Sequence, residues 1–432
     1  MKLWQKGEET NDFFERFTIG KDRELDLYLA PFDVIGSMAH AKMLGSIGIL
    51  TSVEVEKLVA VLGSIQKQIK DNQFIIEEGV EDVHSQIEKM LIAQLGELGK
   101  KIHTGRSRND QVLTALKLFV REELQQIVHK MIFLFDVLIT QSEKTKSVLM
   151  PGYTHMQVAM PSSFGLWFGA HAESLIDDLI MMKAAHQIAN KNPLGSAAGY
   201  GSSFPVDRDL TTQEMGFTGL DHNVVYAQMT RGKMERSVSF AISSLGATLS
   251  KLAMDVCLYA GQNFGFFKVP VAFTTGSSIM PHKHNPDGFE LLRAKTNQLQ
   301  ALPYELTLIT NNLPTGYHRD FQQLKEHFIP AFGLLKDCLD ITATMVEGLE
   351  VAPGILKEEK YDLLFSVELV NELVQSGMPF RDAYREVAER IKNGTYESIR
   401  QIKHTHVGSI GNLANDRIKD KFMQEFAYFE NL

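Results

Sequence analysis

The stretch GSSIMPHKHNP, residues 276–286, concentrates side chains that can hold negative charge or move protons. Serine, lysine and asparagine can stabilise an anion, whereas a histidine can transfer a proton near neutral pH or bind a metal ion. The glycine and the two X-Pro steps disfavour helix, so we predict a loop. By themselves these residues leave three interpretations open: a surface connection, a metal site or a catalytic flap. The candidate side chains are Ser277, Ser278, His282, Lys283, His284 and Asn285.

A second polar stretch, KIHTGRSRNDQV at residues 101–112, precedes a long segment without glycine or proline. One interpretation is capping alone, in which Ser107, Asn109 or Asp110 accepts hydrogen bonds from the first turn of the following helix. The other is a carboxylate site, because an arginine fork beside hydroxyl and amide donors at a helix start suits an anion. The members of such a site are Arg106, Ser107, Arg108 and Asn109.

The stretch MPGYTHMQ, residues 150–157, places Thr154 and His155 beside a predicted Pro-Gly turn that precedes another long helix. A single histidine is often structural, but its side chain is the one best suited to general acid–base catalysis near neutral pH. Both interpretations of His155 stay open on these residues alone.

A fourth stretch, TGYHRDFQQLKEH at residues 315–327, offers Tyr317, Gln322 and Lys325. These side chains could belong to an ordinary solvated helix start. They could also bind a polar, anionic ligand, since they combine a hydroxyl, an amide and an ammonium group.

Long amphipathic helices separate these polar stretches and must position them. Apolar residues recur at spacings of three and four, the pattern of one buried helical face. Helices of this length usually pack side by side in a bundle. Runs of alternating β-branched residues are almost absent, so the sequence predicts an all-α fold. The predicted helical segments are residues 111–145, 164–185, 234–260, 290–310 and 332–346.

The chain divides into three predicted parts. Residues 1–106 form a mixed helical N-terminal domain, and residues 107–355 form a central bundle of long helices. In residues 356–432 the helices become shorter and more charged, and glycine and proline interrupt them more often. This last part is therefore predicted to be a small C-terminal helical domain.

The composition limits the class of protein. At 432 residues, of which 44% are hydrophobic, the chain can bury a large core. A net charge of −9 argues against general binding of nucleic acid or anionic membranes. The start, MKLWQKGEETND, lacks the apolar core of a secretory signal, and no apolar run approaches the roughly 20 residues of a membrane span. Cys257 and Cys338 fit buried thiols of a reducing compartment, so we expect a cytoplasmic protein.

Taken together, the polar stretches resemble conserved regions of the fumarase/aspartase superfamily and, within it, of the argininosuccinate lyase family. GSSIMPHKHNPDGFELLRAK at residues 276–295 is similar to the superfamily's GSSxMPxKxNP loop, a highly specific motif. HTGRSRNDQV, PGYTHMQ and GYHRDFQQLK resemble the argininosuccinate lyase versions of three further regions. DVIGSMAHAKML at residues 33–44 and NPLGSAAGYGSSFPVDRDL at residues 192–210 also fit, so the resemblance covers essentially the whole chain.

The resemblance implies a homotetramer whose core is a bundle of twenty long helices, five from each subunit. It also implies that each active site is assembled from the polar stretches of three different subunits. The implied reaction is the reversible elimination of argininosuccinate to arginine and fumarate, with no metal ion and no cofactor.

The family pattern also implies roles for individual residues. Ser277 removes the Cβ proton of the substrate, while Lys283 and the loop amides stabilise its alkoxide. His155, oriented by Glu290, serves on the acid side of the reaction. The neighbouring substrate-binding residues are Thr154 and Asn285.

The remaining substrate-binding residues implied by the resemblance fall into two sets. The set that would hold substrate carboxylates is Ser107, Arg108 and Asn109, with Arg231 and His84 nearby. The set that would recognise the arginine portion and the remaining carboxylate is Tyr317, Gln322 and Lys325.

Two departures from the family pattern accompany the resemblance. His284 stands where a second lysine is usual and His282 where glutamine is common, which predicts extra pH dependence between about 6 and 7. In FTIGKDRELD, residues 17–26, the family's substrate-contacting serine has no clear counterpart, and Lys21 or Asp22 would stand in.

Three rival interpretations remain at this point. The first is another lyase of the superfamily, such as fumarase, aspartase or adenylosuccinate lyase, against which GRSRND and the Tyr317 segment argue. The second is a non-catalytic structural homologue of the crystallin type, against which the intact Ser277, Lys283, His155 and Glu290 argue. The third is a helical scaffold that binds partners, which predicts exposed apolar faces and a monomer.

Overall fold

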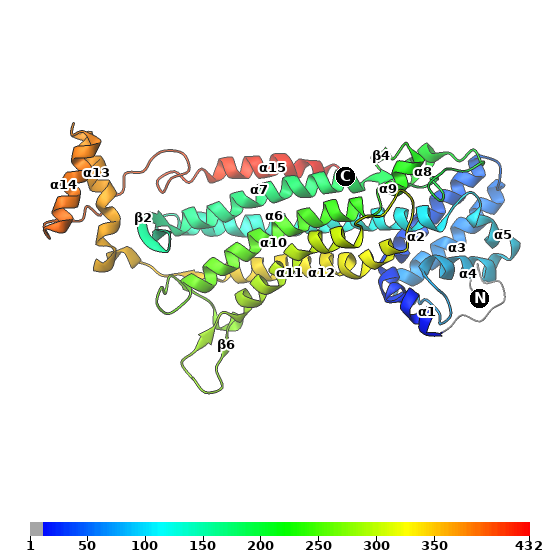
Figure 1. Cartoon of the computed structure of the whole chain (residues 1–432), viewed down its shortest axis with the longest axis horizontal. Coiled ribbons are helices and arrows are strands. Elements are labelled where there is room, and N and C mark those ends of the chain that lie inside the picture. Colours follow the sequence, from blue (N-terminus) through cyan, green and yellow to red (C-terminus); the bar gives the residue numbers. More distant parts are fainter. Residues whose placement is uncertain (1–11) are drawn as a thin grey trace. The chain divides into compact units, whose positions relative to one another are not determined.

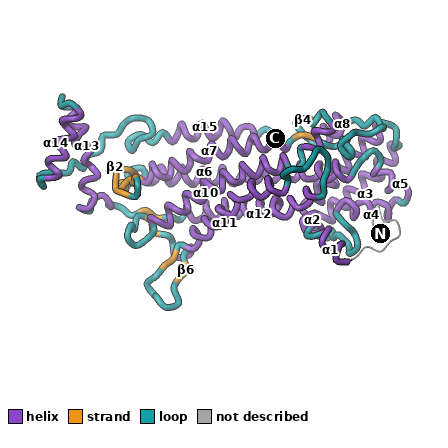
Figure 2. The backbone as a smooth tube through the Cα atoms, viewed as in Figure 1, coloured by secondary structure: helices purple, strands orange, loops and turns teal. Residues whose placement is uncertain are grey.

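The computed structural model describes residues 12–432, and helices dominate them (Figure 1, Figure 2). The described part of the chain contains fifteen α-helices, α1 to α15, and eight short strands, β1 to β8. Each of the four sheets found in these residues has two strands. The predicted all-α class is therefore confirmed.

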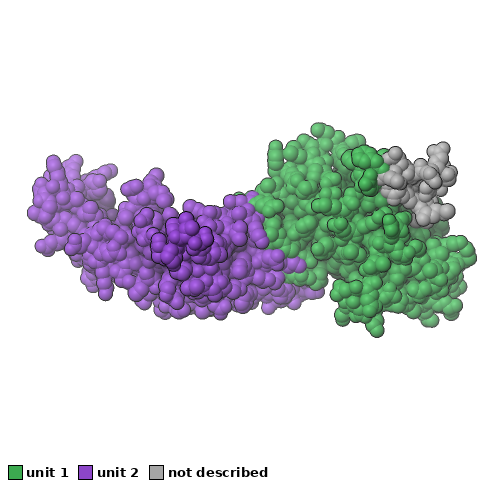
Figure 3. All heavy atoms as spheres, turned by 90° about the horizontal axis from the view of Figure 1, so that it is seen from below, with its two compact units in different colours: residues 1–127, 181–244, 298–335 green, residues 128–180, 245–297, 336–432 purple. Residues whose placement is uncertain are grey.

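The fold divides into two compact units, which Figure 3 colours separately. Unit 1 comprises Met1–Ile127, Met181–Ser244 and Gln298–Leu335. Unit 2 comprises Val128–Ile180, Leu245–Asn297 and Lys336–Leu432. Five long helices contribute residues to both units, namely α6 (Arg108–Thr145), α7 (Phe164–Ala189), α10 (Lys233–Tyr259), α11 (Asp287–Ile309) and α12 (Asp320–Glu347).

Four of the five long helices lie close to where the spacing of apolar residues predicts them, but α12 begins at Asp320, well before the predicted start at residue 332. It continues through Pro330, which removes one helical hydrogen bond and usually ends or kinks a helix. Phe328 and Phe332 are both buried on either side of this proline. Their burial offsets the cost of the proline, which the local sequence rule alone did not weigh.

The helix α10 carries the most regular apolar stripe. Its buried residues are Met234, Val238, Ile242, Leu245, Leu249, Leu252 and Val256. By length and composition α10 is also apolar enough to cross a membrane, with a mean hydropathy of 1.3 over its most apolar window and 44% of that window buried. The core helix of a soluble protein passes the same test, and the buried stripe of α10 is that of a core helix.

Unit 1 has a compact core between α2 (Asp22–Ser46), α3 (Ser52–Lys70) and α4 (Val83–Leu95). Thr51 and Glu54 form a capping box at the start of α3, and Asp82 caps α4. These caps fix where the two helices begin. The fully buried side chains of this core include Val34, Leu44, Leu58, Leu62, Ile65, Val83 and Leu91. The shorter elements of unit 1 are α1 (Asp12–Ile19), α5 (Glu97–Lys100), η1 (Lys101–His103), β3 (Lys191–Asn192), α8 (Arg208–Glu214), β4 (Gly219–Leu220) and α9 (Val224–Met229).

Unit 2 combines two hairpins with a C-terminal helical part. The predicted break near residue 378 lies between α13 (Ser366–Gln375) and α14 (Phe380–Lys392), which pack through Leu369, Val370, Ala383 and Val387. The other elements of unit 2 are β1 (Leu149–Thr154), β2 (Gln157–Ser163), β5 (Phe267–Lys268), η2 (Val271–Phe273), β6 (Thr275–Gly276), β7 (His284–Asn285), β8 (Glu350–Val351), η3 (Ile355–Lys357), η4 (Glu359–Phe365) and α15 (Asn415–Glu430).

The two cysteines are free thiols. Cys338 in α12 is buried as predicted, and burial raises its pKa to about 11. Cys257 in α10 is only half-buried, so the prediction of a buried thiol was wrong for this residue.

Candidate active site

A pocket in unit 1 gathers charged residues from segments that lie far apart in the sequence. It encloses about 580 Å³, including its open mouth. Six predicted substrate-binding residues meet here: His84, Arg108, Arg231, Tyr317, Gln322 and Lys325. The other lining residues are Asp22, Asp26, Glu81, Asp82, Val112 and Arg319.

His84 is held in this pocket by a buried carboxylate on α2. Its Nδ1 lies 2.8 Å from Oδ1 of Asp33, and both side chains are 1% exposed. Gln111 donates its Nε2 to the same oxygen at 2.9 Å. Burial opposes ionisation of Asp33, but attraction to His84 and these hydrogen bonds lower the pKa of Asp33 below its usual value. The other ring nitrogen of His84, Nε2, is buried without a hydrogen-bond partner among the described residues.

Arg108, the first residue of α6, reaches the start of α4. Its Nη1 lies 3.3 Å from Oδ1 of Asp82, and its Nη2 donates to Oγ of Ser85 at 3.1 Å. Asp82 also accepts a hydrogen bond from the Ser85 amide at 2.7 Å. Burial opposes ionisation of Asp82, but the positive charge of Arg108 lowers its pKa. A helix cap therefore also fixes the guanidinium of Arg108.

Ser107 and Asn109 flank Arg108 but mainly serve the start of α6. The Ser107 amide donates to Oδ1 of Asp110 at 2.9 Å, and the Asn109 amide donates to Oγ of Ser107 at 3.3 Å. Asp110 also accepts from the amides of Gly195 and Ala197, at 3.0 and 2.8 Å. Burial raises the pKa of Asp110 to about 6. The capping interpretation thus accounts for these contacts, and both side chains lie outside the pocket lining.

Lys325 is buried between two carboxylates of α2. Its Nζ lies 2.7 Å from Oδ1 of Asp22 and 2.7 Å from Oδ1 of Asp26. Burial disfavours the ammonium form, but the two aspartates raise the pKa of Lys325. Burial raises the pKa of Asp22 to about 6, with only partial opposition from Lys325. Of the two stand-ins expected for the family's serine, Asp22 lines the pocket, whereas Lys21 is the N-cap residue of α2.

Arg231 is buried, and two other residues contact its guanidinium group. Its Nε lies 2.8 Å from Oε1 of Glu235, and its Nη2 donates to the carbonyl oxygen of Phe321 at 2.9 Å. The other oxygen of Glu235 accepts from the Gly232 amide at 2.7 Å. Burial raises the pKa of Glu235. Arg231 therefore presents a guanidinium whose charge is already matched.

Gln322 and Tyr317 differ in how firmly they are held. Gln322 donates its Nε2 to the carbonyl oxygen of Thr18 at 2.7 Å and accepts from Nε of Arg319 at 3.1 Å. Arg319 also lies 3.3 Å from Oε1 of Glu81. Tyr317 precedes α12, lines the pocket and is 41% exposed.

Thr154 and His155 lie in unit 2, at the tip of the hairpin formed by β1 and β2. Thr154 pairs with Gln157, so His155 and Met156 form a two-residue turn with φ values of 53° and 59°. The predicted Pro-Gly turn was wrong, because those two residues lie within β1, where the strand register shifts. The hairpin tip exposes the His155 side chain to solvent.

The GSSIMPHKHNP stretch forms the loop that the sequence predicts, closed at its base by pairing of β6 with β7. Oγ of Ser277 accepts hydrogen bonds from the amides of Ile279 and Met280, at 3.4 and 3.1 Å. Lys283 is exposed in the loop, and Asn285 is half-buried in β7. The two amides give Ser277 an environment that favours negative charge on its oxygen.

Glu290 lies in the first turn of α11 and is exposed. Among the described residues, His155 and Glu290 form no hydrogen bond or ion pair with each other. His282 and His284 are exposed as well. Residues 12–432 contain no group of three or more histidine, cysteine, aspartate or glutamate side chains placed to hold a metal ion.

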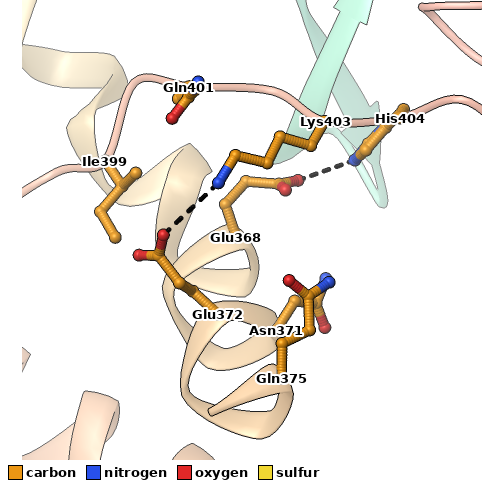
Figure 4. Close-up of a pocket in the computed structure, with 8 residues that line it drawn as sticks. All are labelled: Glu368, Asn371, Glu372, Gln375, Ile399, Gln401, Lys403 and His404. Carbon is orange, nitrogen blue, oxygen red and sulfur yellow. Dashed lines mark hydrogen bonds and ion pairs between the residues drawn. The ribbon is translucent and has the colours of Figure 1, made fainter.

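A second pocket in unit 2 was not predicted (Figure 4). Nε2 of His404 lies 2.9 Å from Oε1 of Glu368, and Nζ of Lys403 lies 3.7 Å from Oε1 of Glu372. Both carboxylates project from α13, whereas His404 and Lys403 come from the segment before α15. These ion pairs attach that segment to α13. The charged residues of this pocket therefore have a structural role.

The sequence motifs missed the acidic partners of the pocket residues. Five of these partners belong to α2 or to the residues just before α4, and the sequence analysis assigned a possible role to Asp22 alone. A signal was nevertheless present, because Asp22, Asp26 and Asp33 recur at spacings of four and seven, on one face of a helix. Acidic residues on a face that is otherwise apolar indicate buried partners. The missed residues are Asp26, Asp33, Glu81, Asp82, Glu235 and Arg319.

Solved structures share the fold. The chain superimposes on EDDS lyase in complex with formate with a TM-score of 0.77 at 21% identity, covering 98% of this chain and 92% of that one. It superimposes on fumarate lyase:delta crystallin from Brucella melitensis bound to cobalt with a TM-score of 0.73 at 17% identity, covering 94% and 92%. At these identities the likeness concerns the fold.

Sequence comparison identifies the family. Residues 5–301 match the protein family described as Lyase. The chain is 60% identical to argininosuccinate lyase of Parabacteroides distasonis, over 96% of this chain and 94% of the relative. It is 38% identical to argininosuccinate lyase of Thermotoga neapolitana, over 90% of this chain and 98% of the relative. The chain is therefore a lyase that belongs to the argininosuccinate lyase family of the fumarase/aspartase superfamily.

Proposed function

We propose that this chain cleaves argininosuccinate reversibly to L-arginine and fumarate, as a step of arginine biosynthesis. The observation that carries the proposal is the 60% identity to an argininosuccinate lyase over nearly the full length of both chains. The pocket supports it, because guanidinium, ammonium and carboxylate groups together suit a ligand with charges of both signs.

In the proposed reaction Ser277 acts as the base. It takes a proton from the Cβ atom of the succinate portion, the electron pair moves toward the adjacent carboxylate, and the carbon–nitrogen bond then breaks. A neutral serine is a weak base, so its alkoxide needs stabilisation. Two loop amides already donate to Oγ of Ser277, and Lys283 adds positive charge once the loop closes and excludes water. Asn285 binds the substrate beside Lys283.

The guanidino group of the substrate is cationic, so breaking the carbon–nitrogen bond alone would leave a neutral guanidine. One proton delivered to the departing nitrogen lets arginine leave as its guanidinium, and it balances the Cβ proton that Ser277 removes. His155 serves on this side of the reaction, oriented by Glu290, and Thr154 binds next to it. The hairpin supports this role, because its tight turn holds His155 in one backbone conformation and exposes its ring.

The binding residues divide between two parts of the substrate. Ser107, Arg108 and Asn109 hold the carboxylates of the succinate portion, with His84 and Arg231 nearby. The role in carboxylate binding is best supported for Arg108, because its contact with Asp82 fixes its guanidinium group at the pocket wall. The residues at the end that takes the arginine portion are Tyr317, Gln322 and Lys325.

We also propose that the chain works as a homotetramer in the cytoplasm, with each active site built from three subunits and a core of twenty long helices. Large apolar side chains on the long helices are exposed in the single chain and would be covered in such a core. Examples are Phe133, Phe240, Leu291 and Tyr304, each more than half exposed. The domains proposed for each subunit are residues 1–106, 107–355 and 356–432. Light scattering should give four times 48.6 kDa.

The test is fumarate formation, followed by ultraviolet absorbance, with purified full-length protein. Argininosuccinate should give a steady rise, whereas malate, aspartate and adenylosuccinate should give none. A rise with one of these three and not with argininosuccinate would assign the chain to another activity of the superfamily. A folded tetramer that is inactive on every substrate would instead favour a structural, crystallin-like role.

A further inference from the structure

An aromatic side chain of β1, Tyr153, packs the hairpin that carries His155 against the rest of unit 2. Its ring centroid lies 5.7 Å from that of Phe264, 6.3 Å from that of Phe266 and 6.4 Å from that of Tyr259. These are distances at which aromatic rings attract each other. The three partner rings also contact one another, with centroids between 5.4 and 5.8 Å apart. Tyr153 is therefore seated in a cluster of rings from the end of α10 and the segment that follows it.

The hydroxyl group of Tyr153 adds a second attachment, to the C-terminal part of the chain. It forms a hydrogen bond with the hydroxyl group of Tyr361 in η4, which is buried. Burial and this hydrogen bond raise the pKa of Tyr153, so the phenol is neutral at physiological pH. Tyr153 and its four aromatic partners all belong to unit 2, so these contacts form within a single subunit.

The place of Tyr153 in the hairpin links this cluster to His155. Thr154, the residue of β1 that follows it, is exposed, so Tyr153 is the last residue of β1 that its own chain packs. Tyr153 pairs with Val158 and Thr154 pairs with Gln157, so strand pairing continues from the seated ring to the turn at His155. Because paired strands are stiffer than a free loop, the seat of Tyr153 determines where the backbone of His155 lies.

We propose that Tyr153 is a positioning residue for His155, because its seat among three aromatic rings sets the direction of the hairpin tip. This inference rests on the proposed function, in which His155 serves on the acid side of the reaction. Proton transfer depends on geometry, and a displacement of about 1 Å can lower a rate about 10²-fold. The seat fixes the backbone at His155, whereas the imidazole takes its working rotamer when the site closes. The alternative is that Tyr153 contributes to the core like any other packed ring and has no bearing on His155.

A double-mutant cycle with His155 separates the two interpretations. Tyr153→Leu keeps an apolar side chain at the seat but removes the ring. In the full-length protein with argininosuccinate as substrate, this variant should lower kcat about 10- to 100-fold and leave KM nearly unchanged. In a His155→Ala background the same substitution should lower kcat no further, because the residue through which Tyr153 acts is absent.

Two further variants control for the loss of a ring from unit 2. Tyr153→Phe keeps the ring in its seat and should restore most of the kcat that Tyr153→Leu loses. Phe168→Leu is the matched structural control, since Phe168 of α7 is fully buried and its ring packs on Trp167 and Phe267. It should lower the Tm without lowering kcat. Thermal denaturation of each variant checks that it is folded.

The outcomes separate this inference from the proposed function. An equal loss of kcat from Tyr153→Leu with and without His155 would overturn the positioning role, as would an equal loss from Phe168→Leu or no loss from Tyr153→Leu. If the parent is active and His155→Ala keeps its full activity, the inference fails while the proposed overall reaction stands. A parent that forms no fumarate from argininosuccinate would overturn the proposed function and the inference together.

Discussion

In the pocket of unit 1 each charged side chain touches a partner of opposite charge, whereas Lys283, His155 and Glu290 of unit 2 are exposed and form no ion pair among the described residues. The two regions also differ in their scaffold. The pocket residues lie on helices or within three residues of a helix start, while His155 and Ser277 lie in hairpin loops.

This difference follows from the cost of desolvating charge. A buried ion must be paired, so the fold itself fixes the geometry of the pocket. A solvated side chain on a loop carries no such requirement, and its final position depends on whatever later covers it. We infer that the pocket residues are preorganised for binding and that the loop residues reach their working geometry when the site closes.

The largest effect should come from Ser277→Ala. Loss of the base should lower the rate of fumarate formation about 10²–10⁴-fold. Thermal stability should stay within about 0.5 kcal/mol of the parent, because Ser277 hydrogen bonds only to its own loop. Ser278→Ala is the matched control and should retain most of the activity. Equal losses in the two variants would mean that the loop acts through its structure and not through Oγ of Ser277.

The next largest effect should distinguish two lysines by stability. Lys325→Met leaves Asp22 and Asp26 buried without a cation and should lower the free energy of unfolding by about 3–5 kcal/mol. Lys283→Met, on the exposed loop, should change it by less than about 0.5 kcal/mol. Chemical denaturation at pH 7.5 measures both. If the two variants lost similar stability, the contrast between a preorganised pocket and a solvated loop would be wrong.

The same contrast explains what the sequence could predict. Spacings of three and four predicted the long helices, because a buried helical face leaves a local pattern. Glycine and X-Pro steps predicted the loop at residues 276–286 for the same reason: the preference is local. The partners of the pocket residues are not local, since Asp26 and Lys325 lie 299 residues apart and Asp33 and His84 lie 51 apart. Only the fold reveals these pairs.

Two other differences between the sequence predictions and the structure have physical causes as well. The early start of α12 reflects burial of Phe328 and Phe332, which tertiary packing supplies and the proline rule ignores. The β1–β2 hairpin was missed because its turn residues, His155 and Met156, are not the usual asparagine and glycine. The sequence predicted a turn beside His155 but placed it at Pro151 and Gly152, which lie within β1.

A moderate, pH-dependent effect should come from Asp22→Asn. The pKa of Asp22 is raised from 3.8 to about 6, so its contribution to stability is fully present below about 4 and is lost as the pH rises through about 6. The asparagine of the variant does not titrate. The free energy of unfolding of the variant, relative to that of the parent, should therefore be about 1–3 kcal/mol higher at pH 7.5 than at pH 4.5. Denaturation at both pH values gives the difference. A gap between variant and parent that does not change with pH would show that Asp22 is ionised throughout this range.

The smallest effect should come from the hairpin tip, where the backbone and not an ion pair holds the site. Met156 has a φ of 59° and is 67% exposed, so Met156→Gly should relieve strain and raise stability by about 0.5–1 kcal/mol. Met160→Gly, in the extended part of β2, has no such strain to relieve and should lower stability by a similar amount. Thermal denaturation compares the two. If both variants were less stable than the parent, side-chain contacts of Met156 would hold the hairpin. The hairpin tip would then resemble the pocket, where side-chain contacts fix the geometry.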